Sequence, residues 1–301
     1  MPKLLHVSDL HFGTPYLPRV GEALQRIAAE LPIDGVVVSG DLTQRAKAEQ
    51  FEAARKFIDQ LPDVPKLIIP GNHDVALYRL WERLSKPYEL YRRFIDDRLD
   101  QVLDLPGMRL VGLNSTSPRR AISNGRIHLE QLEFCKRAFT DAPNGTARIV
   151  VAHHHFAPAP DFLHDEIMPK AKRAMEVFEE LGVEMILGGH LHRAYIGNSL
   201  DFYPGAKRNR GITIVQCGTS TSRRGRGREK EKNSFNVIDV GGHDFLITHF
   251  MYFDDVHGFV PQSEHRYPRR DIAIGESESA GLGSDDTAPR TLLMPRTNSD
   301  R

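Results

Sequence analysis

Short apolar runs recur along the first two thirds of the chain, and each one ends at a polar block. Runs of about five residues bounded by turn-forming residues are typical of buried β-strands. The predicted strands are Lys3–Val7, Gly35–Ser39, Lys66–Pro70, Arg148–Ala152 and Glu184–Gly188. Segments with apolar residues at helical spacing separate most of these strands. The pattern therefore predicts a chain in which strands and helices alternate.

The helical segments are recognised by apolar residues three and four positions apart. Two of them precede the third strand, one from about Val20 to Leu31 and one over Lys47–Leu61. In the second half, the strand Met108–Asn114 and the helices His128–Phe139 and Lys170–Leu181 continue the alternation.

The pattern changes after residue 192, where three predicted strands follow one another without helices: Gly211–Cys217, Asn233–Val240 and Phe245–Phe253. A β-rich end after such an alternation predicts an α/β (α+β) fold, with two mixed sheets packed face to face and helices outside. Residues 1–274 are expected to form one domain. Residues 275–301 are rich in Gly, Ser, Asp, Thr and Pro, and this tail is expected to be disordered.

Composition and charge narrow the classes of partner. The chain has 40 basic and 40 acidic side chains, so its formal net charge is zero. A neutral chain is not expected to bind nucleic acid or an anionic membrane through bulk charge, although a local basic patch stays open. It has no N-terminal apolar segment and no long uncharged span, so we expect a cytoplasmic protein without a membrane partner. Self-association stays open.

The polar blocks at the strand ends carry side chains that bind metals. They supply Asp9, His11, Asp41, Asn72, His190 and His192. Ligands of open α/β sheets gather beyond the carboxyl ends of the strands, so these side chains are expected to share one pocket. Carboxylates and neutral imidazoles together suit two divalent ions, with Mn, Fe and Zn as candidates. A carboxylate such as Asp41 is a natural bridge between two such ions.

The third block also supplies candidates for contact with a substrate. His73 is expected to stay off the metals and face the substrate, with Asn72 beside it. Asp74 is expected to hold the His73 imidazole in one tautomer and to favour its protonated form. His73 and Asp74 are therefore the catalytic candidates. The simpler alternative is a Gly-Asn turn with a surface histidine.

Three consecutive histidines, His153 to His155, follow the fourth strand. Successive side chains of a strand point to opposite faces, so all three cannot reach one site. The residues alone do not show which one does. We take His154 as the metal ligand and keep His153 as the alternative.

Taken in order, the five blocks resemble the calcineurin-like metallophosphoesterase family over roughly residues 1–260. The resemblance implies a four-layer αββα sandwich with a dinuclear centre. It implies that one metal binds Asp9, His11, Asp41 and His192, and that the other binds Asp41, Asn72, His190 and the middle histidine. Many relatives have His-His-Pro after the fourth strand, and aligning that motif with His154, His155 and Phe156 selects His154.

Within this family, the chain looks most like the bacterial 3′,5′-cyclic-nucleotide phosphodiesterases. The resemblance and the charges predict a metal-dependent phosphoric ester hydrolase acting on cyclic nucleotides or other small phosphodiesters. In that mechanism a metal-bound hydroxide attacks phosphorus in line with the leaving group. His73 would then donate a proton to the leaving oxygen.

Two other functions are weighed against this one. The segment His6–Gly13 is also similar to the DNA-repair exonucleases, which makes a nuclease of the same superfamily the alternative. A nuclease needs a surface for the polymer, and Arg223–Lys232 is the strongly basic run. Glu229 and Glu231 interrupt this run and no aromatic residue accompanies it, which favours a solvated loop. A non-catalytic, metal-stabilised scaffold is the third possibility.

Overall fold

The apolar runs of the sequence are strands in the computed structural model, and both faces of most of them are buried. The structure describes residues 1–76, 79–119, 125–159, 166–203, 211–227, 230 and 232–269. Met1–Asp271 make up one compact unit that contains all of them. The predicted tail, residues 275–301, lies outside the described residues, so its expected disorder stays a prediction.

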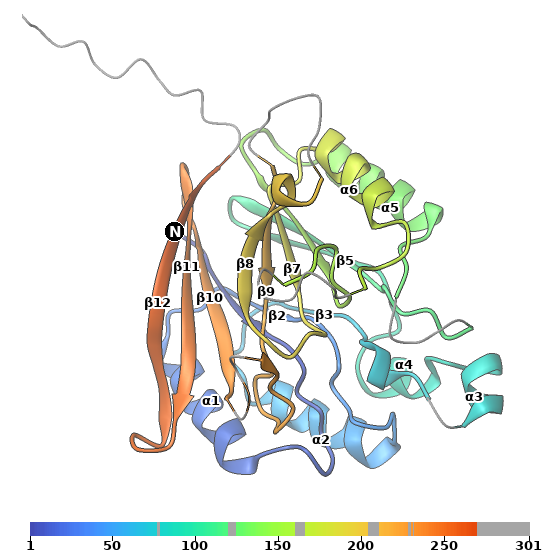
Figure 1. Ribbon diagram of the computed structural model, residues 1–301, viewed down its shortest axis with the longest axis vertical. Helices are drawn as coiled ribbons and strands as arrows, with labels where there is room; N and C mark the ends of the chain where they lie inside the picture. The colour runs from blue at the N-terminus through green and yellow to red at the C-terminus, as the bar shows by residue number, and fades with distance from the viewer. Residues whose placement is uncertain are drawn as a thin grey trace, which may run out of the picture. The chain divides into compact units, whose positions relative to one another are not determined.

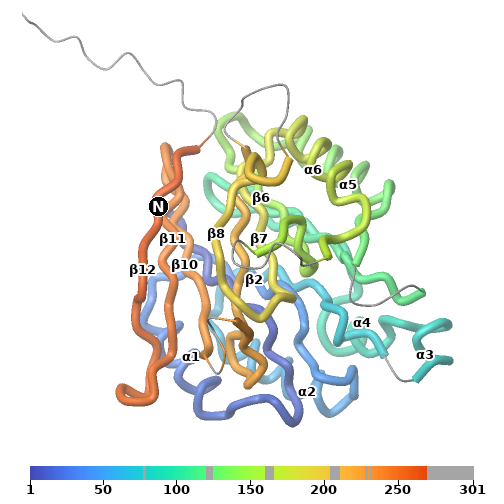
Figure 2. Tube along the Cα trace, in the orientation of Figure 1, coloured from blue at the N-terminus to red at the C-terminus, as the bar shows by residue number. Residues whose placement is uncertain are grey.

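Within the described residues, the first sheet has six strands in the order β12-β11-β10-β1-β2-β3. Their bounds are β1 (Lys3–Val7), β2 (Gly35–Val38), β3 (Lys66–Ile68), β10 (Ser234–Val240), β11 (Asp244–Phe253) and β12 (Gly258–Pro268). Strands β1 to β3 are parallel, whereas β10 pairs antiparallel with β1 and β11 and β12 continue antiparallel. Figures 1 and 2 show the orange C-terminal strands beside the blue N-terminal ones. Two distant parts of the chain therefore share one sheet.

The second sheet, again counted over the described residues, has six strands in the order β4-β5-β6-β7-β9-β8. Their bounds are β4 (Gln101–Leu105), β5 (Met108–Leu113), β6 (Ala147–Ala152), β7 (Met185–Gly188), β8 (Tyr195–Asn198) and β9 (Thr213–Gln216). Strands β5, β6, β7 and β9 are parallel, and β4 and β8 are antiparallel strands at the two edges. Both sheets are thus mixed, as predicted.

Helices cover the outer face of each sheet. The helices are α1 (Pro18–Glu30), α2 (Ala48–Asp59), α3 (Leu80–Ser85), α4 (Glu89–Phe94), α5 (Leu129–Thr140) and α6 (Ala171–Glu180). Leu24 of α1 and Phe51 of α2 share one buried core with Val36 of the first sheet. Phe178 of α6 packs in a second core with Val150 of the other sheet. No helix in the described part of the chain is both long and apolar enough to cross a membrane.

A third core lies between the two sheets and joins them. It contains Leu4 and Leu67 of the first sheet and Ile149 and Leu187 of the second. The layers are therefore helices, sheet, sheet and helices, which confirms the predicted αββα sandwich. Because each central strand is buried on both faces, its sequence is a continuous apolar run.

Three strands have no counterpart among the predicted elements, namely β4, β8 and β12. All three lie at the edge of a sheet. Most side chains of β12 are exposed or half-buried, and its sequence includes Glu264, His265 and Arg266. An edge strand buries fewer side chains than a central one, so it lacks the apolar run by which the others were recognised.

Candidate metal centre

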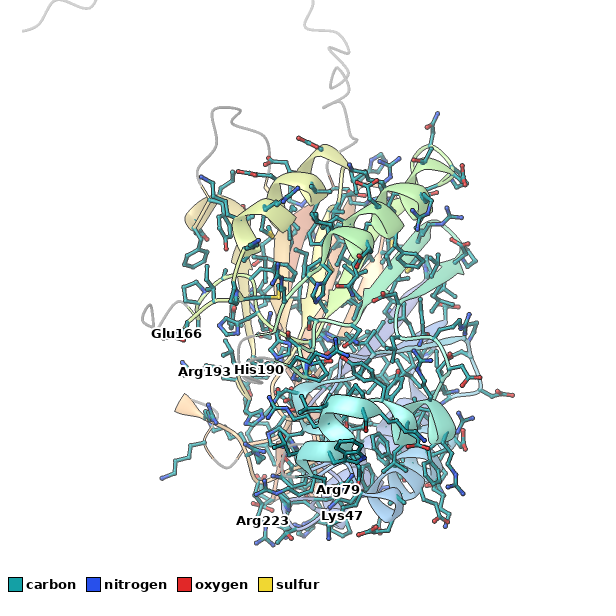
Figure 3. All side chains as sticks on the ribbon, turned by 90° about the vertical axis from the view of Figure 1, so that its right-hand side faces the viewer. Lys47, Arg79, Glu166, His190, Arg193 and Arg223 are labelled. Carbon is teal, nitrogen blue, oxygen red and sulfur yellow. The ribbon has the colours of Figure 1, made fainter. Side chains whose placement is uncertain are left out.

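The polar blocks after β1, β2, β3, β6 and β7 meet at the carboxyl ends of the two sheets. Strands β1 to β3 belong to one sheet, and β6 and β7 belong to the other. In Figure 3, His190 lies where the yellow-green part of the chain meets the blue and cyan part. The site is therefore built from loops of both sheets, and the packing of one sheet on the other sets its geometry.

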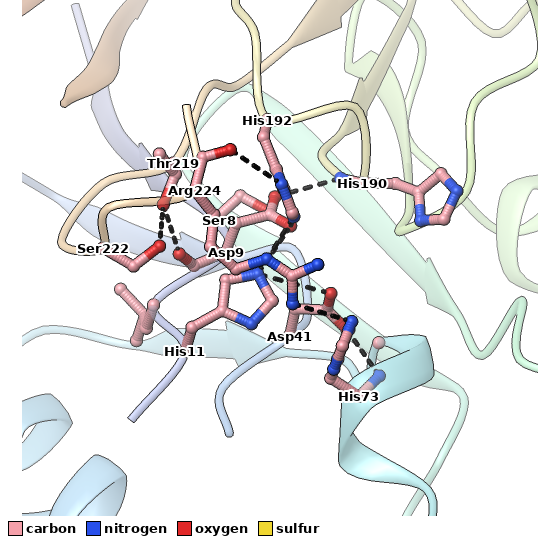
Figure 4. Close-up of polar contacts among 12 residues, drawn as sticks. Ser8, Asp9, His11, Asp41, His73, His190, His192, Thr219, Ser222 and Arg224 are labelled. Atoms are coloured by element: carbon pink, nitrogen blue, oxygen red, sulfur yellow. Dashed lines mark hydrogen bonds and ion pairs between the residues drawn. The ribbon is translucent and has the colours of Figure 1, made fainter. Parts of the chain in front are cut away.

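The first group of ligands consists of Asp9, His11, Asp41 and His192 (Figure 4). Each offers one donor atom, all four atoms lie within 4.8 Å of one another, and all four residues are buried. His11 Nε2 lies 3.0 Å from His192 Nε2 and 3.6 Å from Asp41 Oδ2. The structure thus brings together the four residues that the sequence resemblance assigned to one metal.

The hydrogen bonds around this first group fit a cation. His192 Nδ1 lies 3.0 Å from the Arg224 carbonyl oxygen, which can only accept, so Nδ1 carries a proton. His192 Nε2 faces Asp9 Oδ1, 3.1 Å away. Asp9 Oδ1 and Asp41 Oδ2 are both buried without a hydrogen-bond donor. Such orphaned oxygens are costly, and a divalent ion would satisfy them.

The second group contains Asn72, His153, His190 and the other oxygen of Asp41. Asn72 Oδ1 lies 3.1 Å from His153 Nε2 and 2.9 Å from His190 Nδ1. His153 Nε2 is also 3.4 Å from Asp41 Oδ1. Asp41 therefore directs one carboxylate oxygen toward each group, which is the arrangement of a bridging ligand.

The geometry favours the alternative, His153, among the three histidines. His153 Nδ1 lies 2.8 Å from the Ser39 carbonyl oxygen, which leaves Nε2 facing Asn72 and Asp41. His154 instead has Nδ1 2.8 Å from Ser115 Oγ. The structure thus places His153 Nε2 beside Asn72 and Asp41, which makes His153 the candidate ligand of the second group. Strand β6 ends at Ala152, so strand parity no longer determines where the histidines after it point.

The structure also corrects the role expected of Asp74. Its carboxylate accepts hydrogen bonds from the backbone N–H groups of Leu42, Thr43 and Gly71 at 2.8 to 3.0 Å. The expected contact with the His73 imidazole is not made, because His73 Nδ1 lies 2.9 Å from the Gln44 carbonyl oxygen. Asp74 thus joins the loops after β2 and β3 and holds Asp41 and Asn72 in place.

His73 lies at the border of the first group, with its ring 4.9 Å from that of His11. Its Nε2 is 2.9 Å from Arg224 Nη1. A guanidinium can only donate, so His73 Nε2 accepts and Nδ1 donates to Gln44. The ring is therefore neutral in this arrangement, and burial lowers its pKa although Asp41 opposes that effect. This state differs from the protonated His73 that the sequence predicted.

Arg224 belongs to a loop that sequence reasoning did not place at the site. Thr219 Oγ1 donates to the Asp9 carbonyl oxygen at 2.8 Å, and Thr221 Oγ1 donates to the Leu10 carbonyl oxygen at 2.9 Å. The Ser220 N–H donates to the Ser8 carbonyl oxygen at 3.0 Å. The signal in the sequence was the basic run Arg223–Lys232, which includes Arg224, but a run of charged residues does not reveal its partners.

A sequence profile described as calcineurin-like phosphoesterase matches residues 2–194, a stretch that contains both groups of ligands. The chain belongs to the calcineurin-like phosphoesterase family. Solved structures agree in fold. A purple acid phosphatase from yellow lupin has a TM-score of 0.68 at 12% identity, covering 94% of this chain and 57% of its own. A dimetal phosphatase from Danio rerio has a TM-score of 0.60 at 11% identity, covering 89% and 99%.

Two curated proteins are similar to this chain in sequence. A probable cyclic nucleotide phosphodiesterase of Rhodococcus erythropolis is 27% identical over 206 residues, which are 63% of this chain and 64% of that protein. A probable glycerophosphodiester phosphodiesterase, GpdQ, of Arcobacter nitrofigilis is 27% identical over 165 residues, or 53% and 57%. The matched segments thus span less than two thirds of either relative.

The backbone of this calcineurin-like site is held in an unusual conformation. Five candidate ligands, listed by φ, are Asp9 (53°), His11 (50°), Asp41 (52°), His190 (74°) and His192 (55°). Positive φ is uncommon outside glycine, and strained backbone of this kind concentrates at functional sites. The loops support it mutually, because the N–H groups of Asp9 and His11 donate to the Gly40 and Asp41 carbonyl oxygens, each at 3.0 Å.

Close packing around Asp41 explains the glycine of the third block. A side chain at Gly71 would collide with the backbone nitrogen and carboxylate of Asp41. The glycine therefore lets the loops after β2 and β3 approach each other closely enough for Asp41 and Asn72 to share a site.

The protonation states of the first group suit metal binding. Burial alone would raise the pKa of Asp9, but the neighbouring His192 and His11 outweigh this effect and hold this pKa well below its usual range. Burial lowers the pKa of His11 to about 4, so its imidazole is neutral. Metals bind ionised carboxylates and neutral imidazoles.

In the second group, His153 has a pKa that is raised rather than lowered. Burial lowers the pKa of His153, but the charge and hydrogen bond of Asp41 outweigh it and raise the pKa to about 9. A metal at this position must therefore displace a proton from His153.

Adding Mn²⁺ to the metal-stripped protein should raise its Tm by about 5–10 °C. A ligand at 100 times its Kd stabilises a native protein by about 2.7 kcal/mol, and each kcal/mol shifts Tm by about 2–4 °C in a domain of this size. Differential scanning fluorimetry with increasing Mn²⁺ measures the shift. The Asp9→Asn variant is the control and should show a smaller shift. A Tm that does not respond to millimolar Mn²⁺ would contradict the assignment.

Proposed function

We propose that the chain is a metal-dependent phosphodiesterase with a dinuclear centre that hydrolyses small phosphodiesters, cyclic nucleotides foremost. The observation that carries this proposal is the Asp41 carboxylate, whose oxygens face His11 on one side and His153 on the other. The family supports phosphoric ester hydrolysis, and the names of both curated relatives support a diester substrate.

Each group of residues has a distinct task in the proposed reaction. Divalent ions bound here supply Lewis acidity to phosphoryl oxygens and lower the pKa of a bound water. The candidate ligands are Asp9, His11, Asp41, Asn72, His153, His190 and His192, with Mn, Fe and Zn as the candidate metals. The backbone N–H of His73 donates to Asp41 Oδ1 at 2.8 Å and so orients this carboxylate. The strained loops keep the ligands in place before metal binds.

The proposal is tested by Mn²⁺-dependent hydrolysis of four substrates: bis-p-nitrophenyl phosphate, p-nitrophenyl phosphate, 3′,5′-cyclic AMP and linear single-stranded DNA. We expect turnover of the diester and the cyclic nucleotide. The Asn72→Ala variant should lower kcat/KM by about 10- to 100-fold, since it removes the one neutral oxygen among the candidate ligands of the second group and leaves the others in place.

The outcomes separate the proposed function from its alternatives. Degradation of DNA with the cyclic nucleotide untouched would identify a nuclease instead. Turnover of the monoester alone would identify a phosphatase. Activity that survives both chelation and the Asn72 substitution would come from a contaminant, and absence of any turnover by a metal-replete protein would favour a binding scaffold.

A further inference from the structure

The Arg224 guanidinium borders the candidate metal centre, and its hydrogen bonds to side chains are made to neutral groups. Arg224 is half-buried, and its Nη1 lies 2.9 Å from His73 Nε2 and 3.1 Å from Gln44 Oε1. Both partners are neutral. Within the described residues, Arg224 forms no ion pair with an acidic side chain, and the Asp41 and Asp9 carboxylates act on it only through their charge. A partly desolvated cation with neutral partners has unused capacity for an anion.

The loop that carries Arg224 is firmly attached to the site. Thr219, Ser220, Thr221 and Ser222 are at most 1% exposed, and they bond to the backbone of the Asp9 block or to one another. The Arg224 carbonyl oxygen accepts from His192 Nδ1 at 3.0 Å. The same residue thus holds a candidate metal ligand through its backbone and extends its side chain along the other edge of the group, as Figure 4 shows.

Resting on the proposed function, we infer that Arg224 binds a non-bridging oxygen of the substrate phosphoryl group through its guanidinium. The guanidinium fork matches the geometry of phosphoryl oxygens and is always charged, so it suits an oxyanion better than an ammonium does. In the absence of an anion, His73 Nε2 and Gln44 Oε1 accept its hydrogen bonds and keep it extended into the site. The structure thereby assigns a binding task to one member of the basic run.

The neighbours of Arg224 in the basic run differ from it in exposure and in the contacts of their side chains. Arg223 and Arg226 are exposed, and Arg223 lies far below His190 in Figure 3. Near the site, the backbone N–H of Arg223 donates to the Pro15 carbonyl oxygen, and that of Arg226 donates to the His192 carbonyl oxygen. Alanine keeps those contacts, which makes Arg223→Ala a matched control for the loss of one positive charge from the same loop.

The test is isothermal titration of inorganic phosphate into the Mn²⁺-loaded protein. Arg224→Ala should weaken phosphate binding by about 10- to 100-fold, the range expected for a charge-assisted hydrogen bond, while Arg223→Ala leaves the Kd unchanged. Arg224→Lys should recover part of the affinity because it restores the charge without the planar fork. The metal content of each variant is measured by elemental analysis, so that loss of metal is not mistaken for loss of the anion contact.

Two results would overturn the inference. One is an unchanged phosphate Kd in a metal-replete Arg224→Ala or Arg224→Gln variant. The other is an equal loss in Arg223→Ala, which would show that the effect is one of general charge. Phosphate binding does not depend on turnover, so the two proposals can fail separately. If Arg224→Ala binds phosphate more weakly but the wild type hydrolyses no diester, only the proposed function is refuted. If the wild type hydrolyses the diester but Arg224→Ala binds phosphate with an unchanged Kd, only the role of Arg224 is refuted.

Discussion

Replacing Asp41 with asparagine should lower kcat for bis-p-nitrophenyl phosphate by at least about 10³-fold. The substitution keeps the size of the side chain and an oxygen that can accept from the His73 N–H, but it removes the negative charge shared by the two ligand groups. Lewis-acid stabilisation is worth several kcal/mol, and each 1.36 kcal/mol of barrier is a factor of ten in rate. Steady-state kinetics in saturating Mn²⁺ and elemental analysis of bound metal measure the effect.

The control for this substitution is Asp63→Asn. Asp63 is an exposed aspartate in the loop before β3, away from the ligand groups. It should leave kcat and metal content unchanged. If the Asp41→Asn variant folded normally, as judged by circular dichroism, and kept both metals and most of its activity, Asp41 would not be a bridge.

His153→Ala should cost the protein about one bound Mn²⁺ per chain and lower kcat by at least about 10³-fold, because it empties one position of the second group. His154→Ala should keep both metals and change kcat by less than about tenfold, since its described contact is with Ser115 rather than with Asn72. Titration of Mn²⁺ by calorimetry, with kinetics on the same preparations, measures both quantities.

These neighbouring substitutions control for each other. Both histidines are almost fully buried, so both variants remove a similar volume from the interior. A general packing defect would therefore affect them alike and would appear as a lower Tm in each. If the His154 variant lost a metal and the His153 variant kept both, the ligand would be His154, as the sequence comparison had suggested.

Several expectations from the sequence have not been tested by the structure. A cytoplasmic location, the preference for a small phosphoester over nucleic acid, and the identities of the metals stay predictions, as does the oligomeric state. Part of the basic run, including Glu229 and Glu231, lies outside the described residues. The substrate experiment bears directly on the preference for a small phosphoester over nucleic acid.

The sequence by itself determined the layers of the fold. Strands such as β2 and β7 are buried on both faces, and this burial requires continuous apolar runs that can be recognised in one dimension. The same runs ended at Asp41 and at His190, so the sequence also indicated which residues lie at the carboxyl ends of the strands. Exposed edge strands such as β12 carry no such requirement, and they were missed.

Only the tertiary structure decided how the polar blocks meet. The choice of His153 over His154, the attachment of Asp74 to the loop after β2, and the position of Arg224 beside His73 all depend on contacts between loops. In sequence, His73 and Arg224 are 151 residues apart, and they meet because the loop of Arg224 is bonded to the loop after β1, a strand in the same sheet as β3. The direction of a side chain beyond the end of a strand is set by the hydrogen bonds of its loop, and no repeating pattern of residues records them.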